Sequence, residues 1–151
     1  MKIIDILNRC DFSLSFEVFP PKTDTSFDSV QAAVREIAKL RPPFMSVTYG
    51  AGGGRSRYTL EIAEEIKQNY GVESLAHLTC ISSTHEDVHK EIESIQNAGI
   101  ENIMALRGDV PSGMEQEDRS SWAYHHAVEL NREIKEFAPD MCIGGACYPE
   151  V

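Results

Sequence analysis

The sequence lacks a long hydrophobic run, a cluster of basic residues and a paired cysteine motif. Its 151 residues include 14 Lys and Arg against 24 Asp and Glu, so the formal net charge is −10 at pH 7. An acidic chain repels phosphate backbones and anionic lipid, so we expect neither nucleic acid nor a membrane surface as a partner. No segment approaches the roughly 20 apolar residues that a membrane-spanning helix needs.

The few cysteines and the N-terminal residues indicate the compartment. Residues 1–12, MKIIDILNRCDF, carry one Lys and an apolar run broken by Asp5, which is too short for a signal peptide. The 4 cysteines show no C-x-x-C spacing and lie mainly in apolar or strand-like contexts. We therefore expect reduced, packing cysteines in a cytoplasmic protein. The length suits one domain with its own core.

Short apolar segments alternate with amphipathic ones along the whole chain. The periodicity predicts strands over residues 13–19, 44–48, 75–80, 102–106 and 141–148, and helices over 1–9, 26–40, 58–70, 84–98 and 120–137. This alternation is typical of an α/β fold with a parallel sheet and helical crossovers. A doubly wound sheet of five strands fits the pattern, and so do the first five strands of an eight-stranded TIM-type (β/α)8 barrel. Periodicity alone does not choose between them.

The first strand carries a carboxylate in an apolar setting. Glu17 stands between Phe16 and Val18, and Pro20 and Pro21 end the strand because proline cannot donate to a sheet ladder. An ionised carboxylate is costly to bury unless it is paired or protonated. Such a group is typical of a general acid, although pairing with a neighbouring Arg or Lys would also explain it.

Polar side chains also follow the other predicted strands, at the point where each strand gives way to its loop. They are Thr48, Tyr49, His77, Thr79, Arg107, Asp109, Tyr148 and Glu150. In both candidate folds the carboxyl ends of the strands form the rim of the active site. The recurrence of polar residues at all five strand ends therefore predicts a functional site at this rim.

Two segments resemble known signatures without completing them. The loop Gly50–Gly54 is rich in glycine, but the dinucleotide fingerprint needs another glycine where Arg55 stands, so we interpret it as a flexible turn. Residues His85–His89, HEDVH, match the zinc-protease motif H-E-x-x-H. They fall in the first turn of a predicted helix that flanks the sheet, so we expect no metal there. His125 and His126, being adjacent on a predicted helix, cannot chelate together and should lie on the surface.

Taken together, the strand ends resemble those of the methylenetetrahydrofolate reductase family. The matching segments, in the family's order, are FEVFPPK at 16–22, FMSVTYGA at 44–51, HLTC at 77–80, NIMALRGD at 102–109 and YPEV at 148–151. The resemblance implies an eight-stranded α/β barrel that binds FAD at the carboxyl ends of its strands. It also implies reduction of 5,10-methylenetetrahydrofolate to 5-methyltetrahydrofolate, with NADH or NADPH reducing the flavin first.

The resemblance assigns roles to individual residues. Glu17 matches the family's general acid, which helps to protonate the folate and open its imidazolidine ring. Asp109 matches a carboxylate that lies between flavin and pterin and tunes both. Positions that hold FAD in the family match Thr48, His77, Arg107, Gly108, Asp109, Ala123 and Tyr148, although Trp122 replaces the more usual Tyr or Phe before Ala123.

The resemblance also bears on domain organisation. A catalytic barrel of the family is nearly twice as long as this chain, so we expect residues 1–151 to form the N-terminal part of a flavin-binding barrel domain and to associate as a homo-oligomer. The alternative is a non-catalytic half-barrel, a fragment or assembly module that keeps the motifs without the activity.

Overall fold

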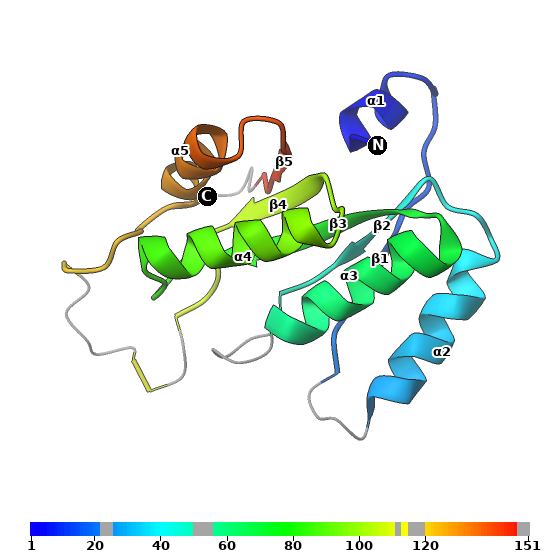
Figure 1. Ribbon diagram of the computed structural model, residues 1–151, viewed down its shortest axis with the longest axis horizontal. Coiled ribbons are helices and arrows are strands. Elements are labelled where there is room, and N and C mark those ends of the chain that lie inside the picture. The colour runs from blue at the N-terminus through cyan, green and yellow to red at the C-terminus, as the bar shows by residue number, and fades with distance from the viewer. Residues whose placement is uncertain (22–25, 50–55, 111–112, 115–119, 148–151) are drawn as a thin grey trace.

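Parallel strands and helices alternate along the computed structural model, as Figure 1 shows. It describes residues 1–21, 26–49, 56–110, 113–114 and 120–147. The strands are β1 (Phe16–Val18), β2 (Phe44–Val47), β3 (Glu73–Thr79), β4 (Asn102–Leu106) and β5 (Cys142–Gly145). The helices are α1 (Ile3–Leu7), α2 (Phe27–Ala38), α3 (Ser56–Tyr70), α4 (His85–Asn97) and α5 (Ala127–Phe137). The predicted α/β class is confirmed.

The order of the strands separates the two architectures that periodicity left open. The 5-stranded sheet has the order β1-β2-β3-β4-β5, and every neighbouring pair is parallel. A doubly wound sheet reverses its strand order at a switch point, and this sheet has no such reversal. Because right-handed crossovers between successive neighbours put every connecting helix on the same side, α2, α3 and α4 cover one face of the sheet (Figure 1). The sheet is therefore consistent with part of a TIM-type barrel.

The core lies between the sheet and these helices. Alternate residues of each strand point toward the helices, for example Val47 in β2 and Ile103 in β4, each with 0% of its surface exposed. From the helices, Ile62, Ile66 and Ile92 are equally buried against them. Full burial of each such side chain stabilises the fold by about 1.5–3 kcal/mol. This apolar layer fixes which strand residues face the other way, toward the candidate site.

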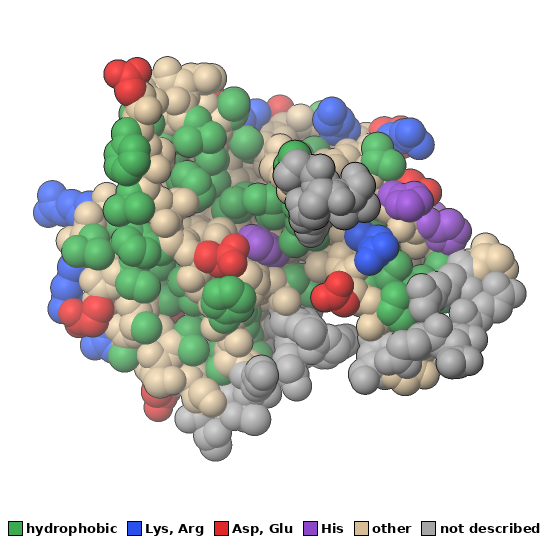
Figure 2. All heavy atoms as spheres, turned by 180° about the vertical axis from the view of Figure 1, so that it is seen from behind, with side chains coloured by type: hydrophobic (Ala, Val, Ile, Leu, Met, Phe, Trp, Pro, Cys, Tyr) green, Lys and Arg blue, Asp and Glu red, His purple; other side chains and the backbone are tan. Residues whose placement is uncertain are grey.

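The opposite face of the sheet carries no helix among the described residues. Figure 2 views the molecule from this side, and hydrophobic side chains gather there toward α1 and β1. Leu14 and Phe19, on either side of β1, are 55% and 68% exposed. Exposed apolar groups next to a sheet edge favour contact with further protein, and the same open face leaves room for a ligand.

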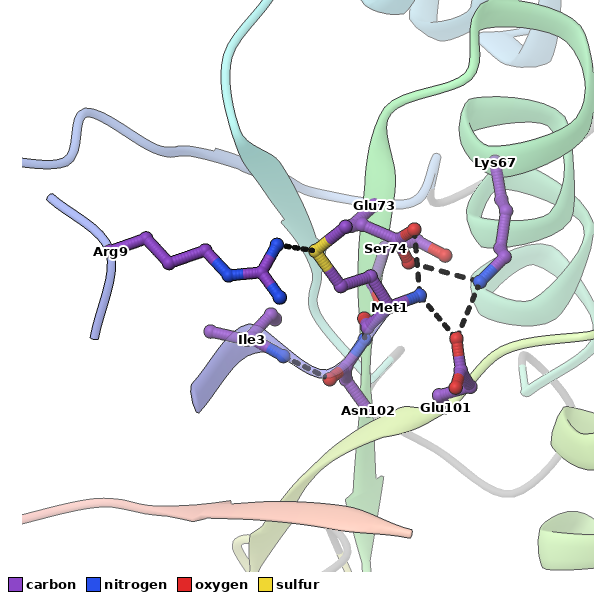
Figure 3. Close-up of polar contacts among 8 residues, drawn as sticks. All are labelled: Met1, Ile3, Arg9, Lys67, Glu73, Ser74, Glu101 and Asn102. Carbon is purple, nitrogen blue, oxygen red and sulfur yellow. Dashed lines mark hydrogen bonds and ion pairs between the residues drawn. The ribbon is translucent and has the colours of Figure 1, made fainter. Parts of the chain in front are cut away.

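The N-terminal segment covers the amino ends of β3 and β4, opposite the candidate site. Figure 3 shows the Met1 ammonium paired with Glu73, at 2.8 Å, and with Glu101. Buried Asn102 accepts a hydrogen bond from the Ile3 N–H at 2.7 Å and donates to the Met1 carbonyl at 3.1 Å. These contacts hold α1 at the amino ends of β3 and β4, so the carboxyl ends stay uncovered by this segment.

Most predicted elements occur, and the main errors lie at their ends. The predicted helix over 120–137 begins only at Ala127, because His126 is its N-cap with an extended backbone (φ −138°, ψ 152°). The predicted first strand is shorter as well, since only Phe16–Val18 pair with β2. All four cysteines are free, but Cys10 and Cys147 are exposed, so the expectation of packing cysteines is wrong for these two. Among the described residues, no helix has the length and apolar character needed to cross a bilayer.

Candidate functional site

Most of the predicted site residues lie at the carboxyl ends of β1 to β4, which is one end of the sheet. Glu17 lies one residue before the end of β1, and Thr48 follows β2 directly. His77 lies near the carboxyl end of β3, and Arg107, Gly108 and Asp109 follow β4. Because all strands run in parallel, their carboxyl ends lie on the same side of the sheet. The predicted rim is thus present in the structure, while Tyr148 and Glu150 lie outside the described residues.

Glu17 points to the helix-free face and meets two polar side chains there. Its Oε2 lies 3.6 Å from His77 Nε2, and it accepts a hydrogen bond from Ser46 Oγ at 3.4 Å. The side chain of Glu17 is 47% exposed, so the expectation that it is buried in an apolar strand is wrong. Its neighbours Phe16 and Val18 face the helices instead, as strand alternation requires. Solvent therefore reaches a carboxylate that has partners but remains open to a ligand.

Sequence reasoning missed Ser46. It pairs with Glu17 in the register of β1 and β2, which puts both side chains on the same face, and it is buried. A serine inside an otherwise apolar strand, FMSV, gives the one available signal, because its hydroxyl needs a partner when buried. Here the Glu17 carboxylate is that partner.

His77 has an unpaired nitrogen inside this site. The residue is 8% exposed, and its Nε2 has no hydrogen-bond partner in the part of the chain that the structure describes. The 3.6 Å separation of Nε2 from Glu17 Oε2 is too long for a hydrogen bond. Burial lowers the pKa of His77, and the nearby Glu17 carboxylate only partly opposes this shift. A buried neutral imidazole with a free nitrogen is suited to bind a polar ligand atom.

Backbone contacts hold Thr48 and the turn after β4 in place. The Thr48 N–H donates to the Val18 carbonyl at 2.9 Å, and its own carbonyl accepts from Thr59 Oγ1 at 2.9 Å. After β4, the Arg107 carbonyl accepts from the Ile81 N–H at 2.8 Å. Thr48 and the turn are thereby tied to neighbouring elements.

Gly108 is required by the shape of that turn. Its φ is +82°, a conformation that favours glycine, and a Cβ at this position would lie 2.8 Å from Thr79 Cβ. The close approach of Gly108 to Thr79 leaves the side chains of Arg107 and Asp109 exposed on either side. Arg107 Nε donates to the Gly108 carbonyl at 3.1 Å. The turn thus presents a cation and a carboxylate at the rim.

Ala123 does not follow a strand directly, unlike Thr48 and Arg107. It is exposed in the segment that precedes α5, directly before Tyr124, whose side chain is fully buried. The role of Ala123 as a flavin contact stays a prediction.

The zinc-protease match has a structural explanation. Residues His85–His89 form the first turn of α4, as predicted, and Thr84 and Asp87 form a capping box at that end. Each histidine has a ring nitrogen 2.8 Å from a carboxylate oxygen of Glu133. No group of three metal-binding side chains occurs within the described ranges. His125 and His126 are exposed, as predicted, although neither belongs to the helix.

Cys80 is no candidate for a nucleophile. It follows β3 in the core, and burial raises the pKa of its thiol to about 11. The thiol therefore stays protonated near neutral pH, whereas the reactive form of cysteine is the thiolate. The chemistry of the rim accordingly depends on its carboxylates, imidazole and guanidinium.

The fold and the site define a parallel α/β protein with a polar, ligand-accessible site at the carboxyl ends of its strands. A family model described as methylenetetrahydrofolate reductase matches residues 2–151, and the chain belongs to this family. It is 34% identical over 99% of its length to "Methylenetetrahydrofolate reductase 2" of Schizosaccharomyces pombe, of which it covers 24%. It is 37% identical over 92% of its length to "5,10-methylenetetrahydrofolate reductase" of Salmonella typhimurium, of which it covers 45%. The chain thus spans less than half the length of these curated relatives.

Proposed function

We propose that this chain forms the N-terminal part of a flavin-dependent reductase that converts 5,10-methylenetetrahydrofolate to 5-methyltetrahydrofolate. The observation that carries the proposal is the meeting of Glu17, Ser46 and His77 on the open face of a parallel sheet, in a chain of this family. In this proposal, residues 1–151 supply the first five strands of a cytoplasmic TIM-type barrel, and NADH or NADPH supplies the electrons. A relative from Arabidopsis thaliana carries NADH in its name, "Methylenetetrahydrofolate reductase (NADH) 1".

The residues at the rim fit FAD. The buried Nε2 of His77 lacks a partner that a polar atom of the cofactor would provide. The Gly108 turn packs too closely on Thr79 for any side chain, so it presents backbone and the exposed Arg107 guanidinium to a ligand. Guanidinium groups bind anionic groups such as phosphate well. Thr48, His77, Arg107, Gly108, Asp109, Ala123 and Tyr148 would hold the cofactor, which supplies the hydride when it is bound.

Glu17 would perform the acid chemistry on the folate. Its carboxyl group is half exposed on the helix-free face, so a substrate nitrogen can approach it. The Ser46 hydroxyl donates a long hydrogen bond of 3.4 Å to the same oxygen that faces His77, so both groups lie beside the carboxyl group. A positioned acid of this kind contributes about 10²–10⁴-fold to a rate. Asp109, exposed on the turn after β4, would place a second carboxylate near the reacting groups.

The alternative function is a non-catalytic half-barrel that acts as an assembly module. Within the described sheet, β1 and β5 each have one neighbouring strand, so both present an unpaired edge. The exposed Leu14 and Phe19 lie beside the β1 edge. Unpaired edges next to apolar surface favour association with another chain, including a second copy. We therefore expect that the 151-residue polypeptide by itself is not a stable monomer with bound FAD, and that it associates, aggregates, adopts an open sheet or needs further barrel strands in trans.

One experiment separates the two functions. The full polypeptide that contains this chain is purified, titrated with FAD, reduced without oxygen, and mixed with 5,10-methylenetetrahydrofolate while flavin absorbance is recorded. Light scattering is measured on the same sample. Saturable FAD binding and folate-dependent reoxidation support the reductase. A colourless preparation that associates and leaves flavin unbound supports the assembly module.

A further inference from the structure

Three side chains from two segments contact Glu133 of α5, away from the rim described above. With Glu133 they form the Glu133 cluster, which consists of His85, His89, Tyr124 and Glu133. His85 Nδ1 lies 2.8 Å from Glu133 Oε2, and His89 Nε2 lies 2.8 Å from Glu133 Oε1. The Tyr124 hydroxyl donates to Glu133 Oε2 and lies 3.1 Å from His85 Nδ1. One carboxylate thus joins the start of α4, the segment before α5, and α5 itself.

Tyr124 is the buried member of the Glu133 cluster. It is 1% exposed, so its hydroxyl is removed from bulk water and requires the carboxylate as its acceptor. Burial and the hydrogen bond to Glu133 raise the pKa of Tyr124, so the phenol remains a donor. The His85 ring lies 5.0 Å from the Tyr124 ring, and His89 stacks on Phe137 at 4.0 Å. The position of Tyr124 is therefore fixed by packing and by hydrogen bonding together.

A second glutamate fixes the backbone next to Tyr124. Glu129 Oε2 accepts from the N–H of His125 at 2.5 Å and from that of His126 at 2.8 Å. Glu129 and Glu133 are four residues apart on α5, so they lie on the same face of the helix. The Cys80 thiol, just beyond the end of β3, lies 4.0 Å from the His126 carbonyl. Residues 124–126 are thus held to α5 and to the end of a central strand.

This arrangement determines where Ala123 lies. Ala123 directly precedes Tyr124, so loss of the Tyr124 anchor would release the backbone at Ala123. Along with Tyr124, His85, His89 and Glu133, it lines a cavity of about 620 Å³ beside α5. The buried Tyr124 side chain therefore anchors the backbone next to Ala123.

We propose that Tyr124 and Glu133 are positioning residues of the flavin site, because their hydrogen bond holds the segment that carries Ala123. This inference rests on the proposed function, in which Ala123 is a flavin contact. The residues act at a distance, since Glu133 reaches the segment only through Tyr124. The two histidines complete the carboxylate's contacts and, in this inference, bind no metal.

Tyr124→Phe tests the proposal with the smallest change, since it removes one hydroxyl and keeps the ring. Tyr70→Phe is the control for loss of a tyrosine–glutamate hydrogen bond, because the half-buried Tyr70, the last residue of α3, donates to Glu65 at 2.9 Å. Wild type and each variant are made in the full polypeptide that contains this chain and are compared for the FAD dissociation constant, the thermal midpoint and hydrogen exchange over residues 120–126. We expect Tyr124→Phe to weaken FAD binding about tenfold and to accelerate exchange in that segment, since the lost bond is to a charged group. Tyr70→Phe should leave FAD affinity unchanged.

A second pair of variants addresses the carboxylate. Glu133→Gln should weaken FAD binding as Tyr124→Phe does, while Glu136→Gln, an exposed residue on the same helix, should not. Equal FAD affinity for Tyr124→Phe and wild type, with faster exchange in the segment, would overturn the proposal and leave the proposed function intact. A wild-type protein that binds no FAD would overturn the proposed function, and this inference with it.

Discussion

Adding one methyl group at Gly108 should destabilise the chain more than the same change at any glycine in open space. In Gly108→Ala the residue keeps a φ of +82°, which costs an L-residue about 1–2 kcal/mol. The new Cβ would also lie 2.8 Å from Thr79 Cβ and 3.2 Å from Ile81 Cγ2. Overpacking of this kind costs a further 1–3 kcal/mol or so. We therefore expect the free energy of unfolding to fall by about 2–5 kcal/mol, out of the roughly 5–15 typical of a domain.

Gly99→Ala separates the two contributions. Gly99 has a φ of +73°, and nothing lies within 4 Å of a Cβ built there, so this variant carries the backbone strain alone. Urea unfolding followed by circular dichroism gives both free energies, and all samples are compared at one protein concentration because association would shift the midpoint. Gly108→Ala should lose clearly more stability than Gly99→Ala. Equal losses would refute the argument that close packing on Thr79 shapes the turn.

The other predictions concern the rim and the histidines. Asp109→Ala should slow folate-dependent flavin reoxidation while changing the free energy of unfolding by no more than about 0.5 kcal/mol, since the residue is exposed; a collapse of the thermal midpoint would instead indicate a structural role. Burial lowers the pKa of His77 below the ordinary 6.5, so the unfolded chain binds a proton at His77 more readily than the folded chain does. The contribution of His77 to the free energy of unfolding should therefore be fully present above pH 6.5 and should be lost as the pH falls below that value. Urea titrations across that range should show a slope of at most about 1.4 kcal/mol per pH unit from this group, and a His77→Gln variant with an unchanged slope would contradict the assignment. Elemental analysis of purified protein should find no stoichiometric zinc; stoichiometric zinc that is lost in His85→Ala or His89→Ala would show that the HEDVH segment binds metal after all.

The sequence predicts the elements well where the local pattern is unambiguous. The strand Asn102–Leu106 occurs as predicted, because a short apolar run between Gly99 and Gly108 leaves little choice of boundaries. The start of α5 was predicted too early, because residues 120–126 look compatible with a helix. Glu129, three residues after His126, was the available sign of the true start, since the two form a capping box. The strand order required the structure, because periodicity does not specify which strands pair.

The sequence places the polar residues at the ends of the strands, but it does not show how their side chains pair, and their functional roles stay predictions. Residues at the ends of parallel strands must share an edge, so Glu17, His77 and Asp109 could be grouped without coordinates. The exposure of Glu17 was not predictable, because it depends on which face of the sheet the helices cover. The Glu133 cluster joins residues up to 48 positions apart, such as His85 and Glu133, and no local signal connects them.

We propose Glu17 as the general acid of a flavin-dependent folate reduction. The two half-reactions of the Glu17→Gln variant, measured separately, test this role. The polypeptide that contains this chain is loaded with FAD, and stopped-flow absorbance follows flavin reduction by NADH or NADPH and then reoxidation by 5,10-methylenetetrahydrofolate. If Glu17 is the acid, flavin reduction in the variant should stay close to the wild-type rate. Reoxidation should be slower by about 10²–10⁴-fold, since only this second step needs the acid. Reoxidation at the wild-type rate would contradict the account.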